Sequence, residues 1–363
     1  RVSGDIYSNF MRAQNALITC MPLMMFCVYA CMLLISWFGA GKIVDSGNDP
    51  AIGFTTGQLM SLVSYAMQIL MSLMMLAMVF VMIIMSRASM ERVVELLDEK
   101  SDLKNCDNPI CTVEDGSIKF DNVSFSYGRE KNAKPCLSDI NLEIKSGETV
   151  GIIGGTGSSK SSLVQLIPRL YDVNEGAVYV GGVDVRKYDI ESLRNEVAMV
   201  LQKNVLFSGT ISDNIRWGDE NANQEEVERV CRLAQADEFI KQMPDGYNTI
   251  IEQGGSNVSG GQKQRLCIAR ALLKKPKIII LDDSTSAVDT RTDALIREAF
   301  ANEIPDTTKL IIAQRISSVQ HADKIVVMDN GVITAVGTHE ELMKDCEVYR
   351  EIYISQQKGG DEE

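Results

Sequence analysis

"ETVGIIGGTGSSKSSLVQLIPRL", Glu148–Leu170, is the stretch that decides the fold class of this 363-residue chain. Its first residues, "ETVGIIG", have the composition of a short buried strand, and its last residues, "KSSLVQLIPRL", have the pattern of a helix. Between them "GGTGSSKS", Gly154–Ser161, fits the G-x-x-x-x-G-K-[ST] pattern, except that Ser159 takes the place of the second glycine. Backbone N–H groups of such a loop, with the N-terminus of the following helix, bind phosphate oxygens. We therefore predict a phosphate loop, Gly154–Ser161, between a strand and a helix.

The positions of this loop have distinct expected roles. Lys160 would pair with the β- and γ-phosphates of a nucleotide, and the Ser161 hydroxyl would bind Mg²⁺. Ser159 departs from the pattern because a Cβ at a glycine position restricts the backbone and crowds the phosphates. A chance Gly/Ser turn is the alternative if the motif is taken alone. The predicted nucleotide-binding residues here are Gly154, Gly155, Thr156, Gly157, Ser158, Ser159, Lys160, Ser161 and Ser162.

Further short apolar stretches alternate with helical segments after Gly116, among them "KIIILDD" and "KLIIAQR". This alternation predicts a mainly parallel sheet with ligands at the carboxyl ends of its strands. Asp282 ends one such strand, where a carboxylate can hold Mg²⁺ directly or through water. Gln202 follows another strand, where its amide could contact the metal or the attacking water. The predicted metal ligands are Ser161, Gln202 and Asp282.

The N-terminal part has a different character. Residues 16–40 and 59–85 carry no charge, and each run exceeds the roughly 20 residues that a spanning helix needs. We predict spans at about 14–40 and 56–85, with the second helix continuing to about 98, within a partial transmembrane domain, 1–100. A linker, 101–115, and a soluble domain, 116–363, would follow.

Charges beside the spans predict their orientation. Arg12 precedes the first span, and Arg87 and Arg92 follow the second, so both ends are expected in the cytoplasm and the loop between the spans outside. The expected location is the cell membrane, as a multi-pass protein with a cytoplasmic soluble domain. Because the chain does not begin with Met, we expect it to be a piece of a longer polypeptide.

The charge and the cysteine content of the chain restrict the classes of partner and metal site that it is expected to have. The net charge is −13, which argues against nucleic acid, because phosphate backbones need clustered Lys and Arg. The nine Cys form no CxxC pair, so we expect free thiols and no Cys-based metal site. The lipid bilayer is the expected surrounding of the two apolar runs.

"NVSGGQKQRLCIARAL", Asn257–Leu272, lies just upstream of the strand that ends at Asp282. This segment resembles the signature of ABC transporter ATP-binding domains, and motifs in matching order extend the resemblance over residues 116–350. The two apolar runs resemble the last two of six helices in an ABC exporter half. The resemblance implies transmembrane α-helices followed by an α/β P-loop NTPase domain, with a mainly parallel sheet, an antiparallel β part and a helical subdomain.

The resemblance also implies residue roles, with ATP and Mg²⁺ as cofactors. Tyr127 matches the aromatic that stacks on adenine, and Gln202 matches the lever between ATP and the membrane domain. The signature would bind the γ-phosphate of ATP held by the opposite subunit, through Ser259, Gly260, Gly261 and Gln262. The segment 286–289 resembles the loop that joins the two ATP sites across the dimer.

Two positions depart from a hydrolytic site. The family has Glu after the metal-binding Asp, whereas this chain has Asp283, which is shorter by about 1.5 Å. A misplacement near 1 Å can cost roughly 100-fold in rate. The family has His where this chain has Gln314, and an amide can donate a hydrogen bond but cannot become cationic. The candidate catalytic residues are Asp283, Gln314 and Gln202.

Together with Ser159, these departures predict a site that binds ATP and hydrolyses it poorly. We expect the ATP-binding subunit of a multidrug-type heterodimeric ABC exporter, whose second half-transporter subunit carries the competent site. A slow homodimeric exporter and an ATP-gated membrane module without transport are the alternatives. The sequence does not name the exported substrate, and multidrug, lipid and peptide cargoes all stay open.

Overall fold

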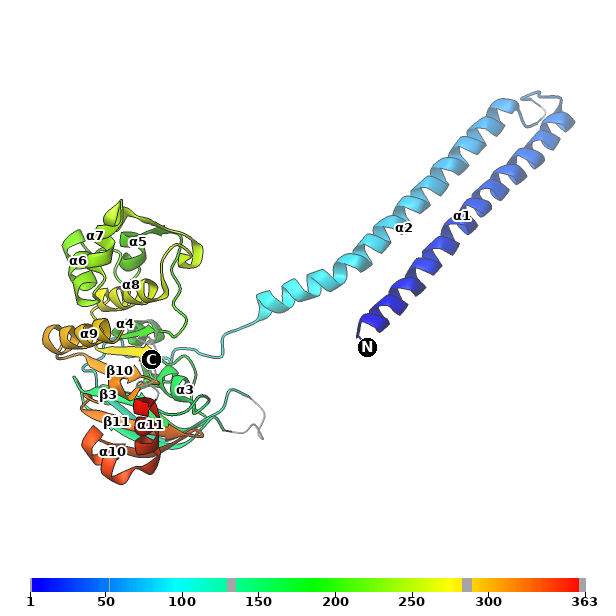
Figure 1. The fold of residues 1–363 in the computed structure, drawn as a ribbon. Helices are drawn as coiled ribbons and strands as arrows, with labels where there is room; N and C mark the ends of the chain where they lie inside the picture. Colours follow the sequence, from blue (N-terminus) through cyan, green and yellow to red (C-terminus); the bar gives the residue numbers. More distant parts are fainter. Residues whose placement is uncertain (1, 52, 129–134, 283–288, 359–363) are drawn as a thin grey trace. The chain divides into compact units, whose positions relative to one another are not determined.

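The computed structural model describes residues 2–51, 53–128, 135–282 and 289–358 (Figure 1). The chain divides into two compact units, residues 1–101 and 102–363.

The first unit consists of two long helices, α1 (Val2–Ser46) and α2 (Thr56–Asp98). Thr55 and Gln58 form a reciprocal capping box at the start of α2, in which each backbone N–H donates to the other's side chain. Apolar side chains are exposed along both helices, for example Trp37 and Met75. Two helices of the described chain, Pro22–Ser46 and Thr56–Asp98, are long and apolar enough to cross a membrane.

A helix of 43 residues at 1.5 Å per residue spans about 65 Å, roughly twice the thickness of a bilayer's hydrocarbon core. The end of α2 at Asp98, beyond the apolar run, therefore agrees with a helix that continues past the membrane. The exposed apolar surface of this unit agrees with the two predicted membrane spans.

A six-stranded sheet forms the centre of the second unit, in the order β12-β11-β3-β10-β9-β6. All its neighbouring strands are parallel except β11 and β12. The strands are β3 (Thr149–Ile153), β6 (Val197–Val200), β9 (Ile278–Asp282), β10 (Thr308–Ile312), β11 (Lys324–Asp329) and β12 (Val332–Gly337).

An antiparallel sheet in the order β2-β1-β4-β5 forms a second layer, and β7 pairs with β8 in a small ribbon. These strands are β1 (Ile118–Phe125), β2 (Leu137–Ile144), β4 (Glu175–Val180), β5 (Val183–Asp184), β7 (Gly209–Thr210) and β8 (Ile250–Ile251). The predicted combination of a mainly parallel sheet and an antiparallel part is confirmed.

The helices fall into a group inserted between β6 and β9, and others that flank the sheets (Figure 1). The inserted group confirms the predicted helical subdomain and contains α5 (Ile211–Arg216), α6 (Gln224–Leu233), α7 (Asp237–Gln242), η2 (Gly246–Asn248), η3 (Gln253–Gly255) and α8 (Gly260–Leu273). The others are α3 (Lys160–Gln165), η1 (Val185–Lys187), α4 (Ile190–Glu196), α9 (Thr290–Glu303), η4 (Ile316–Ser318), α10 (His339–Asp345) and α11 (Glu347–Lys358).

The central sheet is buried on both faces. Along β9, Ile278 and Ile280 belong to the core shared with the antiparallel sheet and α3, whereas Ile279 and Leu281 belong to the core under α8 and α9. Successive side chains of a strand point to opposite faces, so a strand covered on both sides is apolar throughout. This explains why "IIIL" has no alternation.

The helix after the phosphate loop is shorter than predicted, because α3 ends at Gln165 instead of continuing to Leu170. Pro168 is the physical reason: it lacks a backbone N–H, and it disfavours helical geometry at Ile167 before it. The chain continues in turns, and Arg169 has a positive φ of 50°.

Residues 102–115, which we name the strap, pack on the second unit although they form no helix or strand. The backbone N–H of Ile110 donates to Lys187 O at 2.9 Å, and its carbonyl accepts from Asp189 N at 2.9 Å. Val113 is 3% exposed and joins the core. The strap is thus part of the folded domain.

Candidate functional site

The carboxyl ends of four parallel strands meet at one edge of the central sheet. Ile312 of β10 pairs with both Ile152 of β3 and Asp282 of β9, and Val200 of β6 pairs with Leu281. The next residues along each strand therefore lie at the same edge. This register brings together four sequence-predicted positions: Gly154, Gln202, Asp282 and Gln314.

The backbone of the phosphate loop has two left-handed positions. Gly157 has φ 84°, which glycine adopts without strain. Ser159 has φ 70° and ψ 23° and is the N-cap of α3, where its side chain makes no capping hydrogen bond. The serine that replaces the pattern's glycine thus keeps a glycine-like conformation, at an energetic cost that glycine would avoid.

Lys160 closes the loop on itself. Its Nζ donates to Gly154 O at 2.8 Å, to Gly155 O at 2.9 Å and to Ser158 Oγ at 3.2 Å. Gly154 has no room for a side chain, since a Cβ there would lie 2.2 Å from Met328 O. These three hydrogen bonds of Lys160 hold its ammonium group against the loop.

Ser161 and Asp282 lie together, although 121 residues separate them in the sequence. The Ser161 hydroxyl donates to Asp282 Oδ1 at 3.0 Å, and Asp282 is 6% exposed. Burial raises the pKa of the Asp282 carboxyl, and the Ser161 hydrogen bond and the Lys160 charge oppose this rise. A buried carboxylate beside a hydroxyl is a donor set that suits Mg²⁺.

Tyr127 follows β1 and contacts the same loop from the antiparallel sheet. Its hydroxyl lies 2.9 Å from Ser162 Oγ and 3.2 Å from Gln165 Oε1, so it can donate its one hydrogen to the Gln165 amide oxygen and accept from the Ser162 hydroxyl. Its ring lies edge-on to Phe125 and Tyr171, with centroids 4.9 and 5.1 Å away. Tyr127 is 54% exposed and so leaves surface beside the phosphate loop that a flat base could cover.

Gln202 and Gln314 are both exposed in bends, two residues beyond β6 and β10. The backbone around Gln314 is held by the C-terminal helix: Gln356 Nε2 donates to Gln314 O at 2.7 Å, and Gln356 Oε1 accepts from Ile316 N at 2.9 Å. The amide side chain that stands in place of the expected His is therefore carried by a well-anchored segment at the sheet edge.

The signature residues lie at the start of α8, in the helical subdomain. Ser259 Oγ accepts from Gln262 N at 3.3 Å, and Gln262 Oε1 accepts from Ser259 N at 2.9 Å. Ser259 and Gly260 are exposed. Their local hydrogen bonds form a capping box within α8.

Several predicted residues lie outside the described part of the chain. Asp283, the candidate base, is one of them, as are Ser286, Ala287 and Val288 of the segment expected to join two ATP sites. Asp289 is described and is the N-cap of α9, where its carboxylate accepts from Thr292 N at 3.0 Å.

Two residues at the site were not anticipated. Cys136, just before β2, places its Sγ 3.0 Å from Ser159 Oγ and 3.4 Å from Ser162 Oγ. Gln356 is the other, through its two bonds to the Gln314 segment. Neither belongs to a motif, because one is an isolated Cys and the other a Gln in a polar helix.

The described residues fit a nucleotide and its metal. The loop offers an uncapped helix start, a lysine ammonium group and a hydroxyl–carboxylate pair. Its backbone is also packed closely, because a Cβ at Gly154 would meet Met328 O and Ser158 Oγ. Phosphate oxygens would be held by Lys160 and the loop N–H groups, and Mg²⁺ by Ser161 and Asp282.

The comparison with family models agrees with this geometry. Residues 137–286 match the model described as ABC transporter.

The chain carries an ABC transporter ATP-binding domain.

Curated relatives extend the likeness over the helices. It is 39% identical over 336 residues, or 93% of the chain, to an uncharacterized ABC transporter ATP-binding protein of Bacillus subtilis, YfiB. It is 42% identical over 318 residues, or 87% of the chain, to YgaD of the same organism, whose name describes a candidate multidrug export ATP-binding/permease protein. The chain spans 57% and 54% of the length of these two relatives.

A solved structure is similar over most of the chain. The structure of a bacterial Atm1-family ABC exporter with ATP bound superposes with a TM-score of 0.77 at 32% identity. The match covers 91% of this chain and 58% of that one. The ATP-binding domain is thus of the exporter type, preceded by apolar helices.

Proposed function

We propose that this chain is the ATP-binding part of an ABC exporter half that couples ATP binding and hydrolysis to efflux of a substrate, and that it works with a different partner half. The observation that carries this proposal is an intact set of nucleotide-binding residues next to an amide side chain, that of Gln314. We name this set the cradle: Tyr127, the loop Gly154–Ser161 and Asp282. Ser161 and Asp282 are hydrogen bonded, while Gln314 stands at the same sheet edge where the family has His.

The proposed binding of ATP rests on the residues of the cradle. Lys160 would hold the phosphates, Tyr127 would offer ring surface to the base, and Ser161 with Asp282, which are hydrogen bonded to each other, would hold the metal. Bound Mg²⁺ would neutralise charge on the β- and γ-phosphates. These residues orient ATP but do not themselves activate water.

We infer that two residues, Gln314 and Asp283, weaken ATP hydrolysis at this site. Gln314 stays neutral at every pH, so it cannot place a positive charge near the γ-phosphate. Asp283 ends its carboxylate about 1.5 Å short of a Glu, which leaves the attacking water less well held. We infer that ATP is retained at this site and turned over slowly.

The signature supports the role of a partner. Ser259 and Gly260 are exposed at the N-terminus of α8, where backbone N–H groups and the helix dipole favour an anion. We propose that this end of α8 binds the γ-phosphate of ATP held by the partner half. The names of relatives such as YgaD support a multidrug-type cargo.

The test compares ATP turnover by the intact half-transporter alone with turnover by the same protein mixed with a half that carries Glu and His. The proposal expects ATP binding by the lone half, with phosphate release that appears only in the mixture. Rapid release by the lone half would show a homodimeric exporter. Turnover in the mixture without vesicle uptake of any drug would favour an ATP-gated membrane module.

A further inference from the structure

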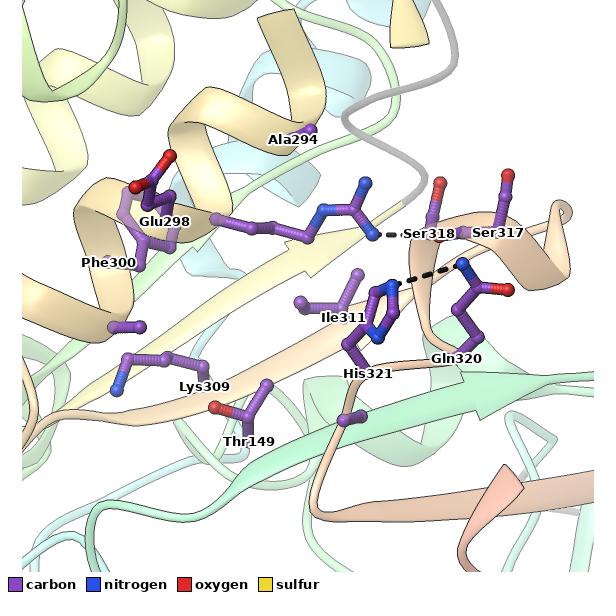
Figure 2. Close-up of a pocket in the computed structure, with 13 residues that line it drawn as sticks. Thr149, Ala294, Glu298, Phe300, Lys309, Ile311, Ser317, Ser318, Gln320 and His321 are labelled. Carbon is purple, nitrogen blue, oxygen red and sulfur yellow. Dashed lines mark hydrogen bonds between the residues drawn. The ribbon is translucent and has the colours of Figure 1, made fainter. Parts of the chain in front are cut away.

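A hollow of about 440 Å³ lies between α9, the central sheet and the segment that follows η4 (Figure 2). Thr149 lines it at the first residue of β3 and Lys309 at the second residue of β10, whereas the phosphate loop begins after the last residue of β3. The hollow is therefore separate from the nucleotide cradle. We name it the α9 pocket.

Small side chains leave this space open. Ala294 and Ala301 line it from α9, and Ala322 lines it from the segment that follows η4. Protein interiors are otherwise packed with few voids larger than a water molecule, and small-molecule sites have volumes of roughly 300–1,000 Å³. Phe300 and Ile311, which are 2% and 4% exposed, give the pocket an apolar floor.

Lys309 is a buried charged residue that lines the pocket and has few polar partners. Lys309 is 4% exposed, and its Nζ donates to Pro305 O at 3.4 Å, near the long limit for a hydrogen bond. Within the described residues it forms no ion pair, although an ammonium group has three donors. Burial lowers the pKa of Lys309, and the more distant charges of Asp323 and Asp306 oppose this.

The other charged groups that face the pocket are already engaged or exposed to water. Arg297 pairs with Asp293 Oδ2 at 2.8 Å and donates to Ser317 O at 2.9 Å. His321 is exposed and lies 3.1 Å from Gln320 Nε2, and Glu298 is exposed on α9. Among the described charged residues that line the pocket, Lys309 is thus the buried one whose demand for an anion is least met. In Figure 2 it lies at the same end of the view as Phe300.

We propose that the α9 pocket binds a small organic carboxylate with an aromatic or branched apolar body, whose carboxylate pairs with Lys309 while its body covers Phe300 and Ile311. Such a ligand would give the buried ammonium group charge-assisted hydrogen bonds and would fill the space that the alanines leave. The proposal does not depend on whether the ATP site is competent.

The test uses a photoreactive aromatic carboxylate, 4-benzoylbenzoate, and its neutral match, 4-benzoylbenzamide, on the full chain in lipid nanodiscs. Saturating ATP and Mg²⁺ are present, so that the nucleotide cradle is filled. Irradiation should label peptides of α9 or of residues 317–322 at submillimolar carboxylate, and about tenfold less efficiently with the amide. Labelling confined to other peptides, or equal labelling by both probes, would overturn the proposal.

Two substitutions locate the binding groups. Lys309→Met removes the charge at similar length and should weaken carboxylate labelling about tenfold, with Lys275→Met as the surface control. Ala301→Phe fills the pocket and should abolish labelling, whereas Asn302→Phe, a neighbour on α9 outside the lining, should not. If Lys309→Met does not fold, Ala301→Phe and the two probes on the unchanged protein decide the question.

Discussion

Two helix N-termini in this domain are expected to meet phosphate, and they are built in opposite ways. At α3 the N-cap Ser159 makes no side-chain capping bond, and side chains from distant strands converge on the loop. At α8 the N-cap Ser259 forms a complete capping box with Gln262, and its hydrogen bonds stay within one turn.

The difference separates a site made by the whole fold from one made by a single helix. The cradle at α3 exists only when β1, β3 and β9 are assembled, since Tyr127, Ser161 and Asp282 come from different elements. The start of α8 is self-sufficient and exposed, so it can present the same geometry to another molecule. A substitution in the cradle at α3 should therefore change ATP binding by the lone chain. A substitution at the start of α8 should change activity only in the assembled pair.

The largest effect is expected from Lys160→Met. This change removes a charged donor from the phosphates, and two charge-assisted hydrogen bonds of about 1.5 kcal/mol each, about 3 kcal/mol together, correspond to roughly 100-fold in affinity. Equilibrium binding of a fluorescent ATP analogue to the lone chain measures it. Lys275→Met, which loses an exposed pair with Glu226, is the matched control and should bind normally. Unchanged binding in Lys160→Met would show that the loop does not hold phosphate.

The next effect concerns turnover at the same cradle. The double change Asp283→Glu with Gln314→His should raise phosphate release by roughly 10- to 100-fold, because it restores reach and a group that can become cationic. Steady-state ATPase assays with the two single variants beside the double one measure it. If the double variant stays as slow as the parent, another feature such as Ser159 limits the site.

A smaller effect tests the start of α8. Ser259→Asp keeps an N-cap but adds a negative charge, whereas Ser259→Asn caps equally well and stays neutral. Neither should change ATP binding by the lone chain. In the assembled pair, Ser259→Asp should lower ATPase activity by about tenfold through repulsion of the γ-phosphate, and Ser259→Asn should lower it far less. Equal loss in both would point to the helix start itself rather than to charge.

The smallest effect concerns backbone strain in the loop. Ser159→Gly removes the strain of a serine in the left-handed region and should stabilise the domain by about 1 kcal/mol. The free energy lost with the Cys136 contact reduces this gain. Thermal unfolding followed by circular dichroism measures the shift. Asn330→Gly, at φ 46°, is the control, because Asn tolerates this conformation and gains less. A melting temperature that falls in Ser159→Gly would show that the Cys136 contact outweighs the strain.

Local patterns in the sequence predicted the elements that have a strong physical signature. The apolar run of β9, the strand before the phosphate loop, and the two uncharged helices each depend on side chains close in sequence. Adjacency of Asp282 to the loop followed from parallel topology, which places strand ends at one edge. The roles assigned to these residues remain predictions.

Other features depended on contacts that no local pattern encodes. The contact of Cys136 with Ser159 joins residues 23 positions apart, and that of Gln356 with Gln314 joins residues 42 apart. The early end of α3 was not predicted, because the apolar periodicity of the sequence continues beyond Gln165. The effect of Pro168 on the backbone outweighs this periodicity. The pairing of the strap with residues near Tyr188 was hidden because its composition is that of a free linker.

The strap has a practical consequence for producing the soluble domain by itself. A cut at Gly116, where the α/β pattern begins, would remove the Lys104 carbonyl that accepts from the buried Arg169, the Asn105 amide bonded to Asp189, and the apolar side chain of Val113. Expression trials should therefore start the fragment at or before Asp102. A fragment truncated at Gly116 would expose an apolar seam and be prone to aggregate.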